Sequence, residues 1–467
     1  MTGILGVGAY APDLRIDAAE FEEAWGRFEA AGIEEKAVPE ADEDALTMAW
    51  EAGRRALDAA EVAPADLAWL GFATTTPPLA EADLTARLGS FFGVPADATR
   101  QEFTGSTRAG TRALFAALAA AEGPALVVAS DCPRGSPEDA HEHAAGAGAA
   151  AFVLGADAPA TVTDRAEYAA TYPGVRFRRA GSDEVEGIDV TSYDRQAFRE
   201  TLAGAVDGLS VDTGDVDAGA VQAPDGALPY RAAGALGVGS DAVQACATVH
   251  DLGDTGAASV PLSLARALAD GADRVLGAAY GSGGGADAFF VTGDAPAELA
   301  LEGDHSLSYA EYLRRREEIT GDPPGGGAAY VSVPTWRRSI PQRHRLEAGR
   351  CPECGSLAFP PEGACTDCHA LVEFEPVRLP PTGEVEAVTA ISYGGEPPEF
   401  ARQQAASGEY GVAVAAFEAE GDRVSLPLQV VGGEHDPAVG DSVRTVVRRI
   451  YEQEGVIRYG RKGTVAD

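Results

Sequence analysis

The chain has 467 residues, 45% of them hydrophobic, which is enough for two or three domains with a sizeable core. Its 73 acidic residues against 36 lysines and arginines give a formal net charge of −37, which argues against non-specific nucleic-acid binding. No apolar run reaches the ~18 residues of a membrane span, and the first residues lack the basic start of a signal peptide. We therefore expect a cytoplasmic protein that does not contact a membrane.

The acidic excess is spread along the chain, and Lys36 and Lys462 are the only lysines. Such a surface is similar to that of halophilic proteins, because molar salt shortens the Debye length to ~3 Å and screens the self-repulsion. The alternative is an unusually acidic protein of an ordinary cell, which would repel phosphate ligands over most of its surface.

Residues 1–155 alternate between strand-like apolar runs and segments with helical spacing of apolar residues. The predicted elements are strands at 3–9, 67–74 and 125–130, and helices at 16–31, 42–60 and 84–92. Residues 156–295 repeat this alternation, and both halves end in a Gly-rich turn that enters a strand, at 146–155 and 281–291. We therefore expect a duplicated α/β domain whose halves are 1–155 and 156–295.

Beyond residue 295 the pattern changes. Residues 296–340 contain a polar helix at 304–318 and a Pro- and Gly-rich linker at 321–327. Residues 376–467 alternate in the manner of about five short strands separated by Pro and Gly, which predicts an all-β Greek-key barrel of the OB type.

Four of the six cysteines form two Cys-x-x-Cys pairs, separated by ten residues, within the segment 341–375. The spacing predicts a zinc ribbon in which Cys351, Cys354, Cys365 and Cys368 bind one Zn²⁺. All four tetrahedral positions are then filled by thiolates, so the metal is structural and His369 is not needed as a ligand.

Residues 101–114 predict a strand, a tight turn of small residues and an Ala-rich helix. Such a turn presents a side chain at a helix N-terminus, where backbone N–H groups and the helix dipole stabilise a developing anion. A cysteine is the usual nucleophile in that setting. Here the turn carries Ser106 and Thr107, so the alternative is a close-packed helix start with no chemistry.

Residues 1–295 resemble the archaeal-type 3-hydroxy-3-methylglutaryl-CoA synthases of the thiolase superfamily. The resemblance rests on segments such as 3–12, 108–111, 146–152 and 281–283, and on Pro224-Asp-Gly226. It implies a duplicated, five-layered α/β thiolase-like fold and a homodimer. The region 303–462 resembles a zinc-ribbon/OB-fold family whose genes often accompany thiolases, through its four cysteines, Val333-Pro-Thr-Trp-Arg-Arg338 and Phe359-Pro-Pro361.

The resemblance also implies where the catalytic residues would lie. In the synthases a cysteine takes the acetyl group, a glutamate removes a methyl proton and a histidine polarises the acetoacetyl partner. The equivalent positions here hold Thr107, Thr75 and Gln222, and Asp254 replaces an asparagine. These substitutions predict that Claisen condensation is lost.

Other polar residues are assigned by the same resemblance or by their surroundings. Arg108, Asp254, Ser282 and Gly283 are expected to bind substrate, and the arginines of 314–316 and 337–338 are candidates for the CoA phosphates. Cys132 is an alternative nucleophile, whereas Cys246 is expected in the core. We expect His141 and His143 to be solvated and His250 to be structural.

These observations support an acyl-CoA-binding protein with a degenerate active site that docks or channels acyl-CoA for a partner such as a thiolase. The second hypothesis is an active acyltransferase with altered chemistry at Thr107 or Cys132. A zinc-ribbon/OB nucleic-acid module is the third, and the excess of acidic over basic residues in 371–467 disfavours it.

Overall fold

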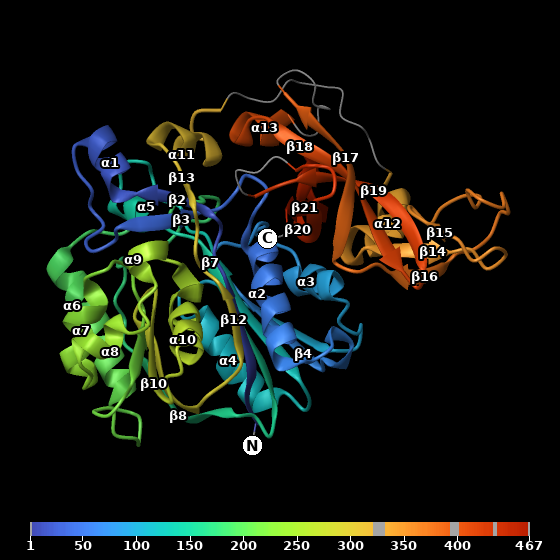
Figure 1. The fold of residues 1–467 in the computed structure, drawn as a ribbon. Coiled ribbons are helices and arrows are strands. Elements are labelled where there is room, and N and C mark those ends of the chain that lie inside the picture. Colours follow the sequence, from blue (N-terminus) through green and yellow to red (C-terminus); the bar gives the residue numbers. More distant parts are fainter. Residues whose placement is uncertain (1, 321–331, 393–400, 433–436, 466–467) are drawn as a thin grey trace. The chain divides into compact units, whose positions relative to one another are not determined.

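The computed structural model describes residues 2–320, 332–392, 401–432 and 437–465, so the predicted linker at 321–327 lies outside the described residues. The chain forms two compact units (Figure 1). Unit 1 comprises most of residues 1–309. Unit 2 comprises residues 310–467 together with the short segments 40–43 and 90–92.

The first half of unit 1 is an α/β arrangement that begins with a long buried strand. Its main elements are β1 (Thr2–Tyr10), α2 (Ala45–Ala60), β4 (Trp69–Ala73), α3 (Leu84–Phe92), β5 (Thr99–Phe103), α4 (Ala109–Ala120), β6 (Ala125–Asp131) and β7 (Gly148–Ala156). Asp44 caps α2, because its carboxylate accepts from the backbone N–H groups of Leu46 and Thr47 while Thr47 closes a capping box. The apolar faces of these elements form one core.

The second half repeats this order. Its main elements are β8 (Ala160–Ala169), α6 (Thr191–Val206), β9 (Ala218–Val221), α7 (Leu228–Ala233), α8 (Ser240–Gln244), α9 (Val249–Leu252), η3 (Gly256–Ala258), α10 (Ser259–Ala269), β10 (Arg274–Gly281) and β11 (Gly285–Gly293). In the first half β4 pairs parallel with β6, which pairs antiparallel with β7. In the second half β9, β10 and β11 pair in the same sense, as expected of a duplication.

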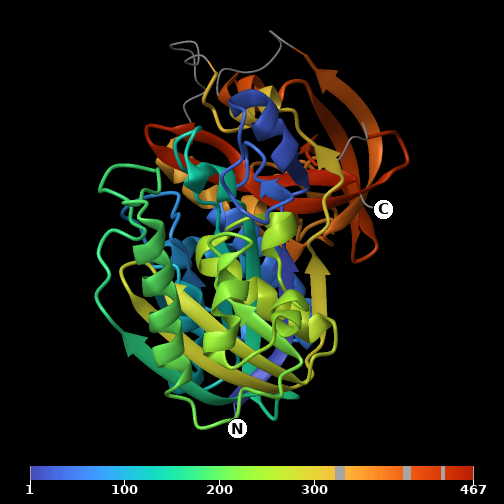
Figure 2. The ribbon, with the colours of Figure 1, turned by 90° about the vertical axis from the view of Figure 1, so that its left-hand side faces the viewer.

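The strands follow the order β5-β4-β6-β7-β1-β8-β11-β10-β9, and the two halves meet where Ile4 of β1 pairs with Ala160 of β8. The helices α4 and α10 contact each other and the strands of their halves, whereas α2 packs on β1, β6 and β7. Figure 2 shows α6, in green, along the strands of the second half, where it contacts β8, β10 and β11. This layering confirms the duplicated, five-layered α/β fold.

Smaller elements complete unit 1. They are β2 (Leu14–Asp17), α1 (Ala18–Trp25), β3 (Glu35–Val38), η1 (Pro64–Asp66), α5 (Ala140–Ala144), η2 (Gly234–Leu236), β12 (Ala297–Ala300) and β13 (His305–Ser306). The strands β13, β2 and β3 form a small separate sheet. The helix predicted at 16–31 is therefore shorter, since its first residues pair with β3 as a strand.

Unit 2 contains a short ribbon followed by a barrel. Its elements are α11 (Tyr309–Arg315), α12 (Val333–Arg345), β14 (Glu347–Arg350), β15 (Leu357–Ala358), β16 (Glu375–Arg378), β17 (Thr382–Ile391), α13 (Ala401–Ser407), β18 (Tyr410–Ala419), β19 (Asp422–Val430), β20 (Ser442–Gln453) and β21 (Val456–Val465). The ribbon sheet has the order β15-β14-β16, and the last five strands close into a barrel of order β17-β18-β19-β21-β20. The barrel confirms the predicted OB-like domain.

Candidate functional site

Thr107 lies in the turn between β5 and α4. Gly105 takes a φ of 79°, a left-handed conformation that suits glycine, and this allows the chain to enter the helix two residues after Thr107. The Thr107 side chain is only 4% exposed, and its hydroxyl donates to the backbone carbonyl of Tyr280, 2.6 Å away. The strand, turn and helix predicted at 101–114 are therefore confirmed, and the Thr107 hydroxyl is held by backbone.

Thr75 belongs to a loop that closes around the carboxylate of Asp131, at the end of β6. This fully buried carboxylate accepts from the hydroxyls of Thr74, Thr75 and Thr76, and from the backbone N–H groups of Thr75, Thr76 and Ala257. The six donor–acceptor distances run from 2.6 to 2.9 Å. Asp131 thus joins the ends of β4 and β6 to η3.

Gln222 follows β9 directly and contacts the same short helix. Its amide nitrogen donates to the carbonyl of Gly256 at 2.9 Å, and its buried Oε1 has no hydrogen-bond partner. Gly110, in the first turn of α4, packs so closely on the carbonyl of Ala257 that a side chain there would collide with it. The elements that carry Thr75, Thr107 and Gln222 therefore meet around η3.

Asp254 lies two residues before η3 and is 2% exposed. One of its carboxylate oxygens accepts from the backbone N–H of Gly256, and the other pairs with the guanidinium of Arg176. The sequence did not single out Arg176, since it lies in an irregular segment without a motif.

The expectation that His141 and His143 are solvated is wrong. His143 is fully buried and stacks on Phe28 with ring centroids 5.4 Å apart, while the side chain of His141 is 20% exposed. Burial lowers the pKa of both imidazoles, and for His141 the charge of Arg176 adds to this effect. The polar sequence of α5 was misleading because that helix is covered by the N-terminal region.

The predicted substrate-binding residues Arg108, Ser282 and Gly283 lie near one another at the β10–β11 turn. Arg108 forms a 2.8 Å ion pair with Asp287, and this acceptor carboxyl has its pKa raised by burial. Gly283 takes a φ of 88° in the tight turn, and its carbonyl accepts from the N–H of Tyr172. Their role in substrate binding stays a prediction.

A hollow of about 440 Å³ opens between α6 and α7 and was not anticipated from the sequence. Its lining combines three arginines with an apolar floor: Arg195, Arg199, Arg231, Phe198, Leu228 and Ala232. In the part of the chain that the structure describes, no carboxylate forms an ion pair with any of the three arginines. In a chain with 73 acidic residues, such a cluster indicates a place for an anionic ligand.

The hollow lies at the same end of the second half as Gln222. Gln222 follows β9, and β10 pairs parallel with β9, so Tyr280 near the end of β10 lies at the same edge of the sheet. Phe198 of α6 contacts the ring of Tyr280, with centroids 5.3 Å apart, and the Tyr280 carbonyl holds Thr107. Packed side chains thus connect the arginines to the candidate catalytic position.

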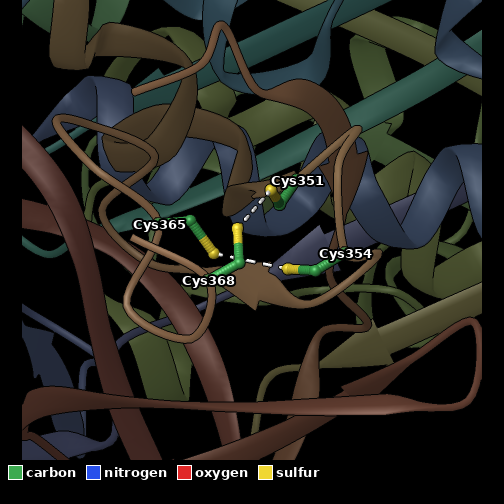
Figure 3. Close-up of side chains that lie close together, drawn as sticks. All are labelled: Cys351, Cys354, Cys365 and Cys368. Carbon is green, nitrogen blue, oxygen red and sulfur yellow. Dashed lines mark hydrogen bonds between the residues drawn. The ribbon is translucent and has the colours of Figure 1, made fainter. Parts of the chain in front are cut away.

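The four paired cysteines converge in the ribbon of unit 2 (Figure 3). The Sγ atoms of Cys351 and Cys368 are 3.7 Å apart, those of Cys354 and Cys365 are 3.5 Å apart, and all four lie within 4.8 Å of one another. Four sulfurs bound to one zinc at ~2.3 Å would be separated by about 3.8 Å. The donor set and its spacing therefore fit a tetrahedral metal.

Both Cys-x-x-Cys turns have the same backbone form. The N–H after each second cysteine donates back to the carbonyl of the first, from Gly355 to Cys351 and from His369 to Cys365. Gly355 and His369 both take positive φ, 82° and 61°. These turns aim backbone and sulfur atoms inward, as metal-binding knuckles do.

The remaining residues that the sequence analysis named lie in different parts of the chain. Cys132 lies with its Sγ 3.8 Å from the hydroxyl of Thr76, whereas Cys246 is buried in the core as expected, and burial raises its pKa to about 12. The Nε2 of His250 and the hydroxyl of Tyr230 form a 2.6 Å hydrogen bond, in agreement with a structural role for His250. Arg315 pairs with Glu40 within unit 2.

Comparison with solved structures identifies the class of fold. A hydroxymethylglutaryl-CoA synthase complexed with CoA aligns with a TM-score of 0.61 and 17% identity, over 71% of this chain and 94% of that one. The 3-oxoacyl-[acyl-carrier-protein] synthase III of Aquifex aeolicus aligns with a TM-score of 0.56 and 18% identity, over 62% of this chain and all of that one. Unit 1 therefore has the thiolase-like fold.

Curated relatives then give the family. Hydroxymethylglutaryl-CoA synthase of Pyrococcus horikoshii is 32% identical over 333 residues, which cover 68% of this chain and 93% of that protein. That of Aeropyrum pernix is 31% identical and covers 68% of this chain and 91% of that protein. The chain belongs to the hydroxymethylglutaryl-CoA synthase family.

The C-terminal part is matched separately. Residues 338–375 match the ChsH2 rubredoxin-like zinc ribbon domain, which confirms the ribbon predicted from the cysteine spacing. Among the described residues no helix is both long and apolar enough to cross a membrane.

Proposed function

We propose that unit 1 binds an acyl-CoA thioester but does not catalyse Claisen condensation. The observation that carries this proposal is how the side chains at the three catalytic positions are used. The hydroxyl of Thr107 donates to a backbone carbonyl, the amide of Gln222 to another, and the hydroxyl of Thr75 to Asp131. Each of these three donors is therefore already used in a hydrogen bond within the protein.

These bonds disfavour each chemical role in turn. A threonine hydroxyl needs a base to become a nucleophile, and the carbonyl of Tyr280 is not one. The free Oε1 of Gln222 is an acceptor, whereas a developing oxyanion requires donors. Asp131 receives six hydrogen bonds, more than the roughly four lone-pair directions of a carboxylate, so it has none left for a substrate proton.

Ligand binding is supported by the arginine-lined hollow. Arg195, Arg199 and Arg231 can bind the phosphates of CoA, and Phe198 of the same hollow packs on Tyr280, whose carbonyl accepts from Thr107. A solved synthase of the same fold is described as complexed with CoA, which supports CoA as a ligand of unit 1. We therefore prefer the arginines of the hollow to those of 314–316 and 337–338 as the binding site for the CoA phosphates.

In this role the protein would act as a scaffold or channelling partner for thiolase-type acyl-CoA metabolism. One structural Zn²⁺ would hold the ribbon, and unit 1 would form a homodimer, as the resemblance implies. Co-purification with mass spectrometry of bound proteins and CoA species tests the partner and the ligand. The second candidate, an acyltransferase with altered chemistry, rests on Cys132, whose partly exposed thiol lies beside the Thr74–Thr76 loop.

The purified chain is expected not to condense acetyl-CoA with acetoacetyl-CoA, and not to acquire a covalent acetyl group. The reason is that residue 107 offers no thiolate and that its hydroxyl already donates to the carbonyl of Tyr280. Intact-mass spectrometry after incubation with acetyl-CoA in high salt is the measurement. An acetyl adduct that disappears in Thr107→Ala or Cys132→Ser would establish the second candidate instead.

Replacing both Arg199 and Arg231 with glutamine is expected to weaken acetyl-CoA binding at least about tenfold, because even one hydrogen bond to a charged group contributes ~1.5–3 kcal/mol. Isothermal titration calorimetry measures the change. Arg274→Gln is the matched control, since this exposed arginine lies on the same unit but contacts Asp215. Equal affinities of the double variant and the control would contradict this placement of the phosphates.

A further inference from the structure

Unit 2 contains two arginines gathered beside one tryptophan. Trp336 lies in the first turns of α12 and is 7% exposed. The Cζ atoms of Arg343, on the same helix, and of Arg458, on β21, lie 4.4 Å and 4.8 Å from its ring centroid. Tyr451 meets the indole edge-on at 6.1 Å. The stack fixes both guanidinium groups at one place where α12 packs on β21.

The helix α12 packs closely on β21 next to the two arginines. Gly460 lies two residues after Arg458, on the same face of the strand, and a Cβ at Gly460 would lie 3.9 Å from the Cβ of Arg343. Arg461, from the same strand, donates twice to the carbonyl of His344. The two arginines are thus held by a fixed helix–strand contact.

No carboxylate neutralises this pair. Arg458 is 9% exposed and its buried Nε has no hydrogen-bond partner, while the Nε of Arg343 donates to the hydroxyl of Ser339. In the described part of the chain neither arginine forms an ion pair, although the charge of Glu362 acts on Arg343 from a distance. Burial and the neighbouring charge of Arg458 lower the pKa of Arg343.

The sequence around the pair is basic as well. The segments 333–345 and 456–465 contain six arginines and one lysine but no aspartate or glutamate. In a chain with a net charge of −37, an acid-free pair of adjoining elements is a local departure from the composition. Its positive field would attract an anion that the rest of the surface repels.

Stacking on an indole stabilises the face of a guanidinium, but it supplies no acceptor for the N–H groups at the edge, and the Nε of Arg458 has none. Two neighbouring cations also repel each other, and burial of the Arg458 charge without a carboxylate partner is costly. An anion between the guanidinium edges would relieve both penalties. Guanidinium forks match the oxygens of phosphate in two parallel hydrogen bonds.

We propose that Arg343 and Arg458, positioned by Trp336, form a binding site in unit 2 for a phosphate monoester or diphosphate. The site is separate from the hollow lined by Arg195, Arg199 and Arg231, and it does not depend on acyl-CoA binding there. Its ligand can be the nucleotide end of a CoA molecule or a free phosphate compound, since both present the same oxygens.

The test uses the full-length chain carrying Arg199→Gln and Arg231→Gln, so that the hollow of unit 1 does not contribute. In this background, calorimetric titration with pyrophosphate and with adenosine 3′,5′-bisphosphate is expected to show one site per chain. Arg458→Gln is expected to weaken binding at least about tenfold, and raising the salt to molar levels should weaken it further. Tighter binding of the bisphosphate assigns a nucleotide ligand, and equal binding assigns a simple phosphate.

Arg423→Gln is the matched control, because this half-exposed arginine of the same barrel pairs with Glu386. Thermal melting of each variant is measured with and without pyrophosphate, which separates loss of the ligand from loss of the fold. The proposal requires that pyrophosphate raises the melting temperature of the Arg423→Gln chain but not of the Arg458→Gln chain. If pyrophosphate does not bind, or shifts both chains equally, the arginines only brace α12 against β21 and the proposal fails.

Discussion

Replacing Cys354 with serine, or removing the metal with a chelator, is expected to unfold the zinc ribbon. The ribbon sheet has only the short strands β14, β15 and β16, and two of its four sulfurs are exposed, so it cannot bury much apolar surface without the metal. Zinc binding in such small sites contributes about 10–16 kcal/mol, which then becomes folding free energy. Metal analysis of the wild-type chain is expected to find one zinc per chain.

Limited proteolysis should show new cleavage within 341–375 in the Cys354→Ser chain. Cys132→Ser is the control, because this cysteine belongs to unit 1 and is not one of the four clustered cysteines, so its loss should leave the zinc content unchanged. Undiminished zinc in the Cys354→Ser chain would show that the four cysteines do not share one metal.

Replacing Asp131 with alanine is expected to destabilise unit 1 by on the order of 5 kcal/mol. The change removes one acceptor group and leaves two buried and four partly buried donors without it, and each buried donor costs ~1–3 kcal/mol before the loop relaxes. The threonine loop and η3 would then separate from the end of β6. Denaturant unfolding followed by circular dichroism measures the loss.

Asp212→Ala provides the comparison for Asp131. This exposed aspartate accepts a single hydrogen bond from the backbone of Gly214, so its replacement should cost less than about 1 kcal/mol. If the two variants unfold at similar denaturant concentrations, Asp131 does not hold the three segments together.

The sequence predicted the fold well where one periodicity extended over a whole element. The helix α3 and the strands β4 and β6 lie where their apolar patterns indicated. It failed for α12, whose six arginine, histidine and glutamine side chains and two prolines hide the helical spacing. It also failed for β8, because that strand is half exposed and pairs with β11 across the middle of the sheet.

The candidate site was predictable only as far as motifs reach. Thr75, Thr107 and Gln222 were located by resemblance, and their elements do converge around η3. Asp131 directly follows a predicted buried strand, so a carboxylate at that edge was a usable signal. The hollow between α6 and α7 could not be foreseen, because its arginines come from two helices and become neighbours only when the chain folds.

The closure of the barrel restricts how unit 2 can recognise another protein. Each of its five strands pairs on both sides, with β17 joined to β20 and β19 joined to β21. The closure is narrow, because β19 pairs with β21 only where Val430 faces Gly463, and residues 422–429 pair with β18 alone among the described strands. Extension of the sheet by a peptide is therefore limited to this stretch of β19. Elsewhere on the barrel a partner must contact side chains and turns, so the choice of partner can diverge between relatives by surface substitution while the backbone framework stays the same.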